Sequence, residues 1–188
     1  VRGNARVQGV GNMSENTFSA ISQFRLDKEV ALITGSGDGL GRIAALTFGE
    51  ASAHVCVSDI DMSLAEKVVR EIEDAGGSAD AWHLDVADNE QIVRVIAEVV
   101  GKHKQIDILV NNAGTAQREP TEDMPLEVWD KIVQINQTQV FMCSREAGQH
   151  MLKEKKGSII NMASIMGLVG GGFYPNFPYH ATKGAVVN

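Results

Sequence analysis

The chain has 188 residues, enough for one domain with a sizeable core, and a composition typical of a globular protein. Its net charge of −7 argues against a nucleic-acid surface, and it has no apolar run of the roughly 18 residues that a membrane span needs. The two cysteines lie in apolar segments without a C-x-x-C pair, so we expect them to be reduced in a cytoplasmic protein. The five histidines are scattered along the chain, and the sequence therefore predicts no metal site.

Residues 1–25 show little periodicity and are predicted to form a loose tail, whereas residues 26–188 are predicted to form the domain. The domain opens with a short apolar strand over residues 30–33 that ends at Thr34. Four glycines follow this strand and lead into a helical pattern; they are Gly35, Gly37, Gly39 and Gly41.

A second apolar strand, residues 54–57, leads to Asp59. Glycines permit a tight loop, and the amino end of the following helix attracts a pyrophosphate. A carboxylate at the end of the second strand can accept hydrogen bonds from ribose hydroxyls. This segment therefore predicts a dinucleotide site, although a glycine-rich turn before an ordinary helix is the alternative.

The rest of the chain alternates between helices and strands. Residues 106–110 are predicted to form a central strand because of their apolar character. This alternation predicts an α/β fold: a three-layer, doubly wound Rossmann-type parallel sheet with the strand order 3-2-1-4-5. The other predicted strands are 78–84 and 158–162, and the predicted helices are 62–75, 89–104, 125–155 and one that begins near Tyr179.

Polar residues near the later elements form a second constellation. Tyr179 and Lys183 lie four residues apart at the start of the last helix, so they share one helix face. A phenol is a poor base at neutral pH, but a nearby ammonium group stabilises the phenolate. Ser164 follows the fifth strand, where its hydroxyl could bind a substrate carbonyl, and Asn136 is a polar residue on an apolar helix stripe. Tyr174 competes with Tyr179 but has no lysine four residues later.

From about Leu26 to its end, the chain resembles the short-chain dehydrogenase/reductase family. The matching features are T-G-x-x-x-G-x-G from Thr34, Asp85 after the third strand, Asn111-Asn112-Ala113-Gly114, Asn136, Ser164, and Tyr179 with Lys183. This resemblance implies an oxidoreductase that transfers a hydride between NAD and a secondary alcohol or ketone.

The resemblance also implies roles for individual residues. Tyr179 would exchange a proton with the substrate, and Lys183 would stabilise its phenolate and bind the nicotinamide ribose. Ser164 would hold the substrate oxygen, and Asn136 would hold a water molecule in a proton relay. The expected cofactor-binding residues are Gly35, Gly39, Leu40, Gly41, Asp59, Asp85, Val86, Asn112, Ala113, Gly114, Tyr179 and Lys183.

Charge favours NAD over NADP, because Asp59 would repel a 2′-phosphate and Asp38 stands where NADP-preferring relatives often carry a basic residue. We expect a small-molecule alcohol or ketone as the substrate and a homo-oligomer, either dimer or tetramer. Neither nucleic acid nor membrane is an expected partner.

Two departures from the family pattern stand out. Residues 170–178 make a slightly longer loop that is expected to shape the substrate pocket, and relatives continue beyond the position of Asn188. We therefore expect the carboxy-terminal part of the domain to be missing from this chain. A 3-oxoacyl-carrier-protein reductase is the nearest alternative, and a non-catalytic nucleotide-binding module is another if the protein ends at Asn188.

Overall fold

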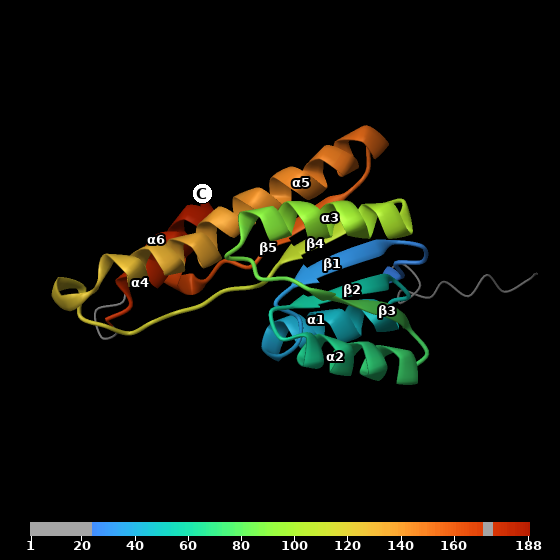
Figure 1. The fold of residues 1–188 in the computed structure, drawn as a ribbon, viewed down its shortest axis with the longest axis horizontal. Coiled ribbons are helices and arrows are strands. Elements are labelled where there is room, and N and C mark those ends of the chain that lie inside the picture. Colours follow the sequence, from blue (N-terminus) through green and yellow to red (C-terminus); the bar gives the residue numbers. More distant parts are fainter. Residues whose placement is uncertain (1–23, 171–174) are drawn as a thin grey trace, which may run out of the picture.

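A computed structural model of the chain describes residues 24–170 and 175–188. They form a five-stranded parallel sheet with the order β3-β2-β1-β4-β5, which confirms the predicted topology (Figure 1). The predicted tail lies outside the described residues except for its last two, and so does Tyr174. The strands are β1 (Val30–Thr34), β2 (His54–Asp59), β3 (Ser78–His83), β4 (Ile108–Asn111) and β5 (Ser158–Asn161).

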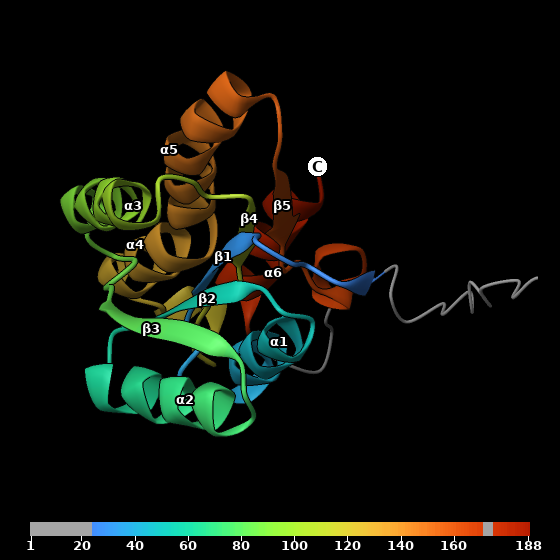
Figure 2. The ribbon, with the colours of Figure 1, turned by 90° about the vertical axis from the view of Figure 1, so that its right-hand side faces the viewer.

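Helices cover both faces of the sheet, as expected for a doubly wound fold (Figure 2). One face carries α1 and α2, and the other carries α3 and α5. Helices α4 and α6 pack together toward the carboxyl ends of the strands (Figure 1). The helices are α1 (Gly39–Glu50), α2 (Met62–Asp74), α3 (Asn89–His103), α4 (Leu126–Val133), α5 (Gln139–Glu154) and α6 (Phe177–Val187).

Strand β1 lies at the centre of the sheet and is buried along its whole length. Its side chains alternate between two apolar cores, because successive residues of a strand point to opposite faces. Leu32 packs in the core under α3 and α5, whereas Ile33 packs in the core over α1 and α2. The central strand therefore holds the glycine loop that follows it on a rigid base.

The fourth strand begins two residues later than predicted, and the apolar description of that segment overlooked Asp107. This aspartate is almost fully buried, but its carboxylate accepts a hydrogen bond of 2.8 Å from the backbone N–H of Val30. It also forms an ion pair of 3.1 Å with Lys156. The polar residue is tolerated in the core because its oxygens have these partners.

The single long helix predicted over residues 125–155 is two α-helices joined by one turn of π-helix, Gln134–Thr138. The wider turn places Asn136 and Gln139 in fully buried positions. Apolar periodicity alone cannot reveal such a turn. A π-helical turn holds one residue more than an α-helical turn, and this extra residue shifts the buried face only locally. π-helical turns of this kind occur frequently at functional sites.

The remaining boundaries agree with the predictions within one or two residues, and Asp88 caps α3 as expected by accepting from the N–H groups of Glu90 and Gln91. In the part of the chain that the structure describes, no helix combines the length and apolar character needed to cross a bilayer.

Candidate active site

The glycine loop after β1 is packed so tightly that three of its four glycines leave no room for a side chain. Gly35 has φ +62°, and a Cβ there would lie 2.9 Å from the Cα of Ala113. A Cβ on Gly41 would lie 2.2 Å from the carbonyl oxygen of Gly35 and 2.4 Å from Asn112 Nδ2. Gly39 differs, because it has φ +56° and no atom near its missing side chain. The loop is therefore closed toward the protein at Gly35, Gly37 and Gly41 and open at Gly39, where a ligand can approach the backbone.

Hydrogen bonds from the segment after β4 hold this loop in place. Thr34 Oγ1 accepts from the backbone N–H groups of Asn112 and Ala113, both at 3.1 Å. The Asn112 side chain donates to the carbonyl oxygens of Thr34 and Gly35 at 3.0 and 2.8 Å. Asn112 thus fixes the loop in addition to lining the cavity described below.

Two buried serines that the sequence analysis did not single out also support the loop. Ser36 Oγ donates to the carbonyl oxygen of Ile33 at 2.8 Å and accepts from the N–H of Ser58 at 3.0 Å. Both serines are fully buried. A serine that directly follows an apolar strand within a glycine loop was the available signal, because a buried hydroxyl needs hydrogen-bond partners.

Asp59 lies at the carboxyl end of β2, as predicted, and its carboxylate is held by backbone donors. Oδ2 accepts from the N–H of Gly37 at 2.9 Å, and Oδ1 accepts from the N–H of Asp61 at 3.0 Å. A Cβ on Gly37 would lie 2.9 Å from Asp59 Oδ2. The glycine loop and the acidic residue therefore form one unit, with the carboxylate fixed beside the loop.

A cavity of about 330 Å³ opens at this carboxyl edge of the sheet. It brings together residues from the ends of β1, β2 and β4 and from the segment after β3. Its lining residues are Gly35, Asp59, Ile60, Leu84, Asp85, Val86, Asn112, Ala113, Gly114, Thr115 and Ile135. Seven of the predicted cofactor-binding residues therefore line one cavity.

Leu40 and the later glycines of the motif do not line this cavity. The Leu40 side chain is 72% exposed, and Gly39 and Gly41 belong to the first turn of α1 beside the loop. Their position at the amino end of α1 agrees with a role in binding phosphate through backbone N–H groups.

Tyr179 and Lys183 lie on one face of α6, as their spacing predicted. Lys183 Nζ is 5.7 Å from the centroid of the Tyr179 ring and donates to the carbonyl oxygen of Met162 at 2.5 Å. Lys183 is almost fully buried, and this burial lowers its pKa from the ordinary value.

Asn136 lies close to Lys183, and protein groups satisfy its amide. Nδ2 donates to the carbonyl oxygen of Thr115 at 2.9 Å and to Thr182 Oγ1 at 3.2 Å, and Oδ1 accepts from the N–H of Thr115 at 2.8 Å. A Cβ placed on Gly114 would lie 3.4 Å from Asn136 Oδ1 and 3.8 Å from Lys183 Nζ. The asparagine therefore joins the segment after β4 to α6, next to the cavity-lining Gly114.

Ser164 lies just beyond β5, where the sequence placed it, and begins a short 3₁₀ turn, Ile165–Gly167. Its Oγ accepts from the N–H of Met166 at 3.1 Å, which leaves the hydroxyl proton free to be donated. Within the described residues, no hydrogen bond joins Ser164 to Tyr179 or Lys183. The structure thus places Tyr179 and Lys183 side by side on α6 and joins Asn136 to the same helix through Thr182, with Ser164 on a separate segment.

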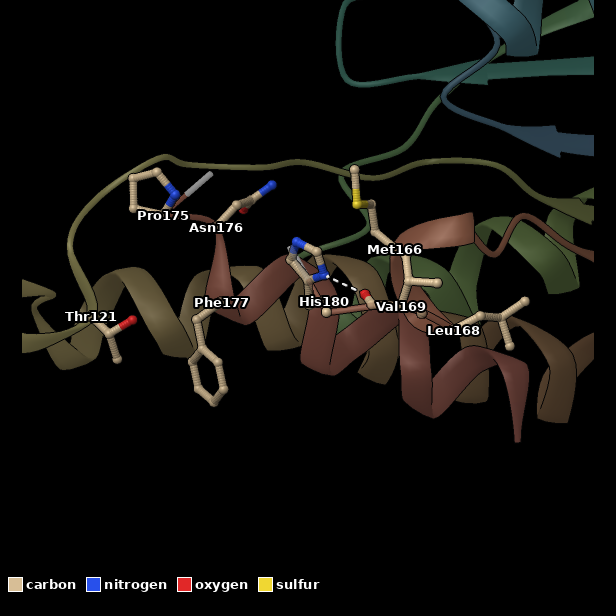
Figure 3. Close-up of a pocket in the computed structure, with 10 residues that line it drawn as sticks. Thr121, Met166, Leu168, Val169, Pro175, Asn176, Phe177 and His180 are labelled. Atoms are coloured by element: carbon tan, nitrogen blue, oxygen red, sulfur yellow. Dashed lines mark hydrogen bonds between the residues drawn. The ribbon is translucent and has the colours of Figure 1, made fainter. Parts of the chain in front are cut away.

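A second cavity, of about 500 Å³, lies between the Ser164 turn and the start of α6 (Figure 3). His180 Nδ1 is 3.2 Å from the carbonyl oxygen of Val169, while His180 Nε2 is buried without a hydrogen-bond partner. Asn176 Oδ1 is also buried without a partner. Sequence analysis expected this loop to shape a pocket but did not identify Asn176 or His180, which have no motif of their own.

These features agree with comparisons to known proteins. The chain belongs to the short chain dehydrogenase family, whose sequence profile matches residues 29–188. The family is one of oxidoreductases, and the matched residues include the glycine loop, the cavity-lining segments and the Tyr179–Lys183 pair.

Individual relatives differ in their activities. 3-Oxoacyl-acyl-carrier-protein reductase FabG of Thermotoga maritima is 36% identical over 163 residues, which cover 87% of this chain and 65% of that protein. Cyclopentanol dehydrogenase of a Comamonas species is also 36% identical over 163 residues, covering 86% of this chain and 64% of the relative.

A crystal structure of a gluconate 5-dehydrogenase from Burkholderia cenocepacia, in complex with NADP and tartrate, superposes with a TM-score of 0.83 at 36% identity. The superposition covers 89% of this chain and 65% of that one. The present chain therefore spans slightly less than two thirds of the length of these relatives.

Proposed function

We propose that this protein is an NAD-dependent oxidoreductase that interconverts a secondary alcohol and a ketone. The observation that carries the proposal is the position of Lys183. Its ammonium group lies on the same helix face as Tyr179 and beside Gly114, which lines the cavity next to the glycine loop. This position supports a proton-transfer pair next to a dinucleotide cleft at one edge of the sheet.

In this proposal, the phenol oxygen of Tyr179 exchanges a proton with the substrate oxygen, and the Lys183 ammonium stabilises the phenolate. The hydroxyl of Ser164 donates a hydrogen bond to the same substrate oxygen. When bound, the nicotinamide supplies or accepts the hydride. Asn136 connects the segment after β4 to α6 through its hydrogen bonds. From this position it would hold a water molecule in a proton relay.

The residues present fit a dinucleotide. Gly39 leaves the loop open to a ligand, the amino end of α1 suits a pyrophosphate, and the carboxylate of Asp59 is held where ribose hydroxyls would be bound. We propose NAD rather than NADP because Asp59 is fixed by two backbone donors and cannot easily move away from a 2′-phosphate. The gluconate 5-dehydrogenase in complex with NADP makes NADP the alternative to be tested.

A reductase of 3-oxoacyl thioesters is the second candidate, favoured by the 36% identity to the Thermotoga maritima protein. It would use the same Tyr179 and Lys183, so the two candidates differ in the substrate and not in the chemistry. Turnover of an acetoacetyl thioester and of cyclopentanol by the same preparation separates them.

We further propose that the protein forms homo-oligomers through α4 and α5. Both helices carry large apolar side chains that are more than half exposed: Leu126 at 66%, Phe141 at 62% and Leu152 at 80%. Light scattering tests this directly, and a monomer at micromolar concentration would contradict it.

The first experiment is a fluorescence titration of the chain with NADH and with NADPH, followed by an alcohol-oxidation assay. NADH should bind at least about ten times more tightly, and Asp59→Asn should reduce that preference by about 5- to 30-fold, which corresponds to about 1–2 kcal/mol of lost repulsion. Equal affinities of the unsubstituted chain for the two cofactors would refute the proposed NAD preference.

Tyr179→Phe tests the chemistry. It should keep NADH affinity within about twofold and lower turnover by at least about 100-fold, the usual effect of removing a general acid or base. Tyr174→Phe is the matched control, because the chain has only two tyrosines, and it should retain turnover. Undiminished turnover in Tyr179→Phe would remove the proposed mechanism.

A further inference from the structure

Four potential metal-binding side chains meet at the amino end of the sheet, on the side opposite the nucleotide cavity. His54 and Cys56 are two residues apart on β2 and therefore point to the same face. Asp80 on β3 is paired in register with Cys56, and His103 is the last residue of α3, which covers this face. The sequence predicted no metal site because its histidines are far apart along the chain, but the parallel pairing of β2 and β3 brings these residues together.

The distances within this cluster are short. One ligand atom from each of the four residues lies within 4.8 Å of the others. His103 Nε2 is 2.8 Å from Asp80 Oδ2, and His54 Nε2 is 3.4 Å from Asp80 Oδ1. The two imidazole ring centroids are 4.3 Å apart. Two histidines, a thiol and a carboxylate therefore surround one point in space.

Hydrogen bonding within the cluster is incomplete in a way that suits a cation. His54 Nε2 is buried and makes no hydrogen bond of good geometry, although Asp80 Oδ1 lies 3.4 Å from it. Its other ring nitrogen, Nδ1, is 2.7 Å from Ser78 Oγ. Metal-bound histidines typically use one nitrogen for the metal and fix the ring through the other, so Ser78 is placed as an orienting partner. Trp82 Nε1 supports the carboxylate in the same way, donating to Asp80 Oδ1 at 2.6 Å.

We propose that His54, Cys56, Asp80 and His103 form a binding site for Zn²⁺ or a closely similar divalent cation. Two nitrogens, one sulfur and one oxygen match the donor preferences of zinc, which favours four ligands in a tetrahedron. Metal–ligand bonds of about 2.0–2.3 Å place ligand atoms roughly 3.3–3.6 Å apart, so the cluster would contract by about 1 Å at its widest pair. Four protein ligands leave no open position, which makes the site structural and not catalytic.

Lys102 is the competitor for this site. Its Nζ is 2.7 Å from Asp80 Oδ2, and the side chain is 57% exposed. A bound cation would take over that oxygen, and the flexible lysine would move into solvent. The alternative to a metal site is a network in which Lys102 forms an ion pair with Asp80 and His103 hydrogen-bonds it, without any metal. Removing Lys102 separates the two interpretations, because it should tighten cation binding but weaken a purely ionic network.

The test begins with protein that has been treated with a chelator and then titrated with Co²⁺, a spectroscopic substitute for zinc. One equivalent should bind and produce both a thiolate-to-cobalt charge-transfer band and the intense visible bands of tetrahedral coordination. Zn²⁺ should displace the cobalt with a Kd at or below about 1 µM. The stoichiometry should be one cation per chain. The absence of a charge-transfer band, or a Kd weaker than about 100 µM, would overturn the proposal.

Matched variants assign the binding to this cluster. Cys56→Ser should abolish the charge-transfer band, whereas Cys143→Ser, which changes the other buried cysteine of the same core, should not. His103→Gln should weaken Zn²⁺ binding by more than about 100-fold, because loss of a metal ligand should exceed the roughly 10- to 100-fold effect of losing an orienting partner. His150→Gln is the matched control and should leave Zn²⁺ binding unchanged.

Two further measurements keep the proposal open to refutation if a cysteine variant folds poorly. Ser78→Ala should weaken zinc binding by about 10-fold, and Lys102→Ala should strengthen it. For the unsubstituted chain, zinc at 100 times its Kd should raise the midpoint of thermal unfolding by roughly 5–10 °C over chelator-treated protein. Zinc affinity that is unchanged in both Cys56→Ser and His103→Gln would show binding elsewhere and overturn the assignment.

Discussion

Gly41→Ala is expected to disrupt the glycine loop even though alanine favours helices. The new Cβ would lie 2.2 Å from the carbonyl oxygen of Gly35 and 2.4 Å from Asn112 Nδ2, distances that real contacts do not show. Relief requires the loop to move away from the Asn112 side chain, which donates to the same Gly35 oxygen at 2.8 Å. Overpacking costs about 1–3 kcal/mol and a lost hydrogen bond about 1 kcal/mol, while helix propensity returns at most about 1 kcal/mol.

The net expectation is a loss of about 2 kcal/mol in the free energy of unfolding, measured by urea denaturation. Gly101→Ala is the matched control, because Gly101 also lies in a helix and a Cβ there would meet no atom within 4 Å. That variant should be more stable than the parent by about 0.5–1 kcal/mol. The two variants should therefore differ by about 3 kcal/mol, and NADH affinity should fall only in Gly41→Ala. Stabilities within about 0.5 kcal/mol of each other would refute the packing argument, because the propensity gain is common to both.

Three other substitutions test separate features. Asn112→Ala should lower the free energy of unfolding by about 1–3 kcal/mol in urea denaturation, because two backbone carbonyls of the loop lose their donor, and an effect below about 0.5 kcal/mol would contradict this. Asp107→Ala should cost a similar amount, since the N–H of Val30 loses its carboxylate acceptor, and unchanged stability would mean that water replaces it. Lys183→Met tests the effect of burying a lysine. Burial lowers the pKa of Lys183, so the unfolded chain binds more protons just below the ordinary value of 10.5. In that pH range, the free energy of unfolding of the parent should rise with pH more steeply than that of Lys183→Met. Parallel pH profiles of the two proteins would show that burial does not lower the pKa of Lys183.

The sheet could be predicted from the sequence because its signals are local. Each strand is a short apolar run between turn residues, and each helix carries an apolar stripe, so alternation alone fixes the doubly wound topology. The glycine loop and Asp59 were identifiable for the same reason, since the strand, loop, helix and acid are consecutive in the chain. The pair Tyr179 and Lys183 depends only on helical spacing, which the structure retains.

The features that the sequence did not reveal depend on contacts between distant segments. Asn136 was expected to be a site residue, but neither its position on an apolar stripe nor the family resemblance revealed that its burial depends on the π-helical turn, or that its partners are Thr115 and Thr182. The turn has no residue signature, because its energy is set by what the wider helix packs against. The position of Ser36 after an apolar strand was a local signal, but its partner Ser58 lies on the neighbouring strand and could not be identified from the sequence.

In the two proposals above, strand β2 contributes residues to two separate sites. Its carboxyl end holds Asp59 beside the glycine loop, and its amino end holds His54 beside Asp80. The four residues between them are fully buried, so a rigid part of the strand connects the two ends. The side chains of His54 and Asp59 also point to opposite faces, because the two residues are five positions apart on the strand. A cation at the amino end would therefore be expected to act on the fold by tying β2, β3 and α3 together. The polar groups proposed to bind the nucleotide lie at the other end of the same strand.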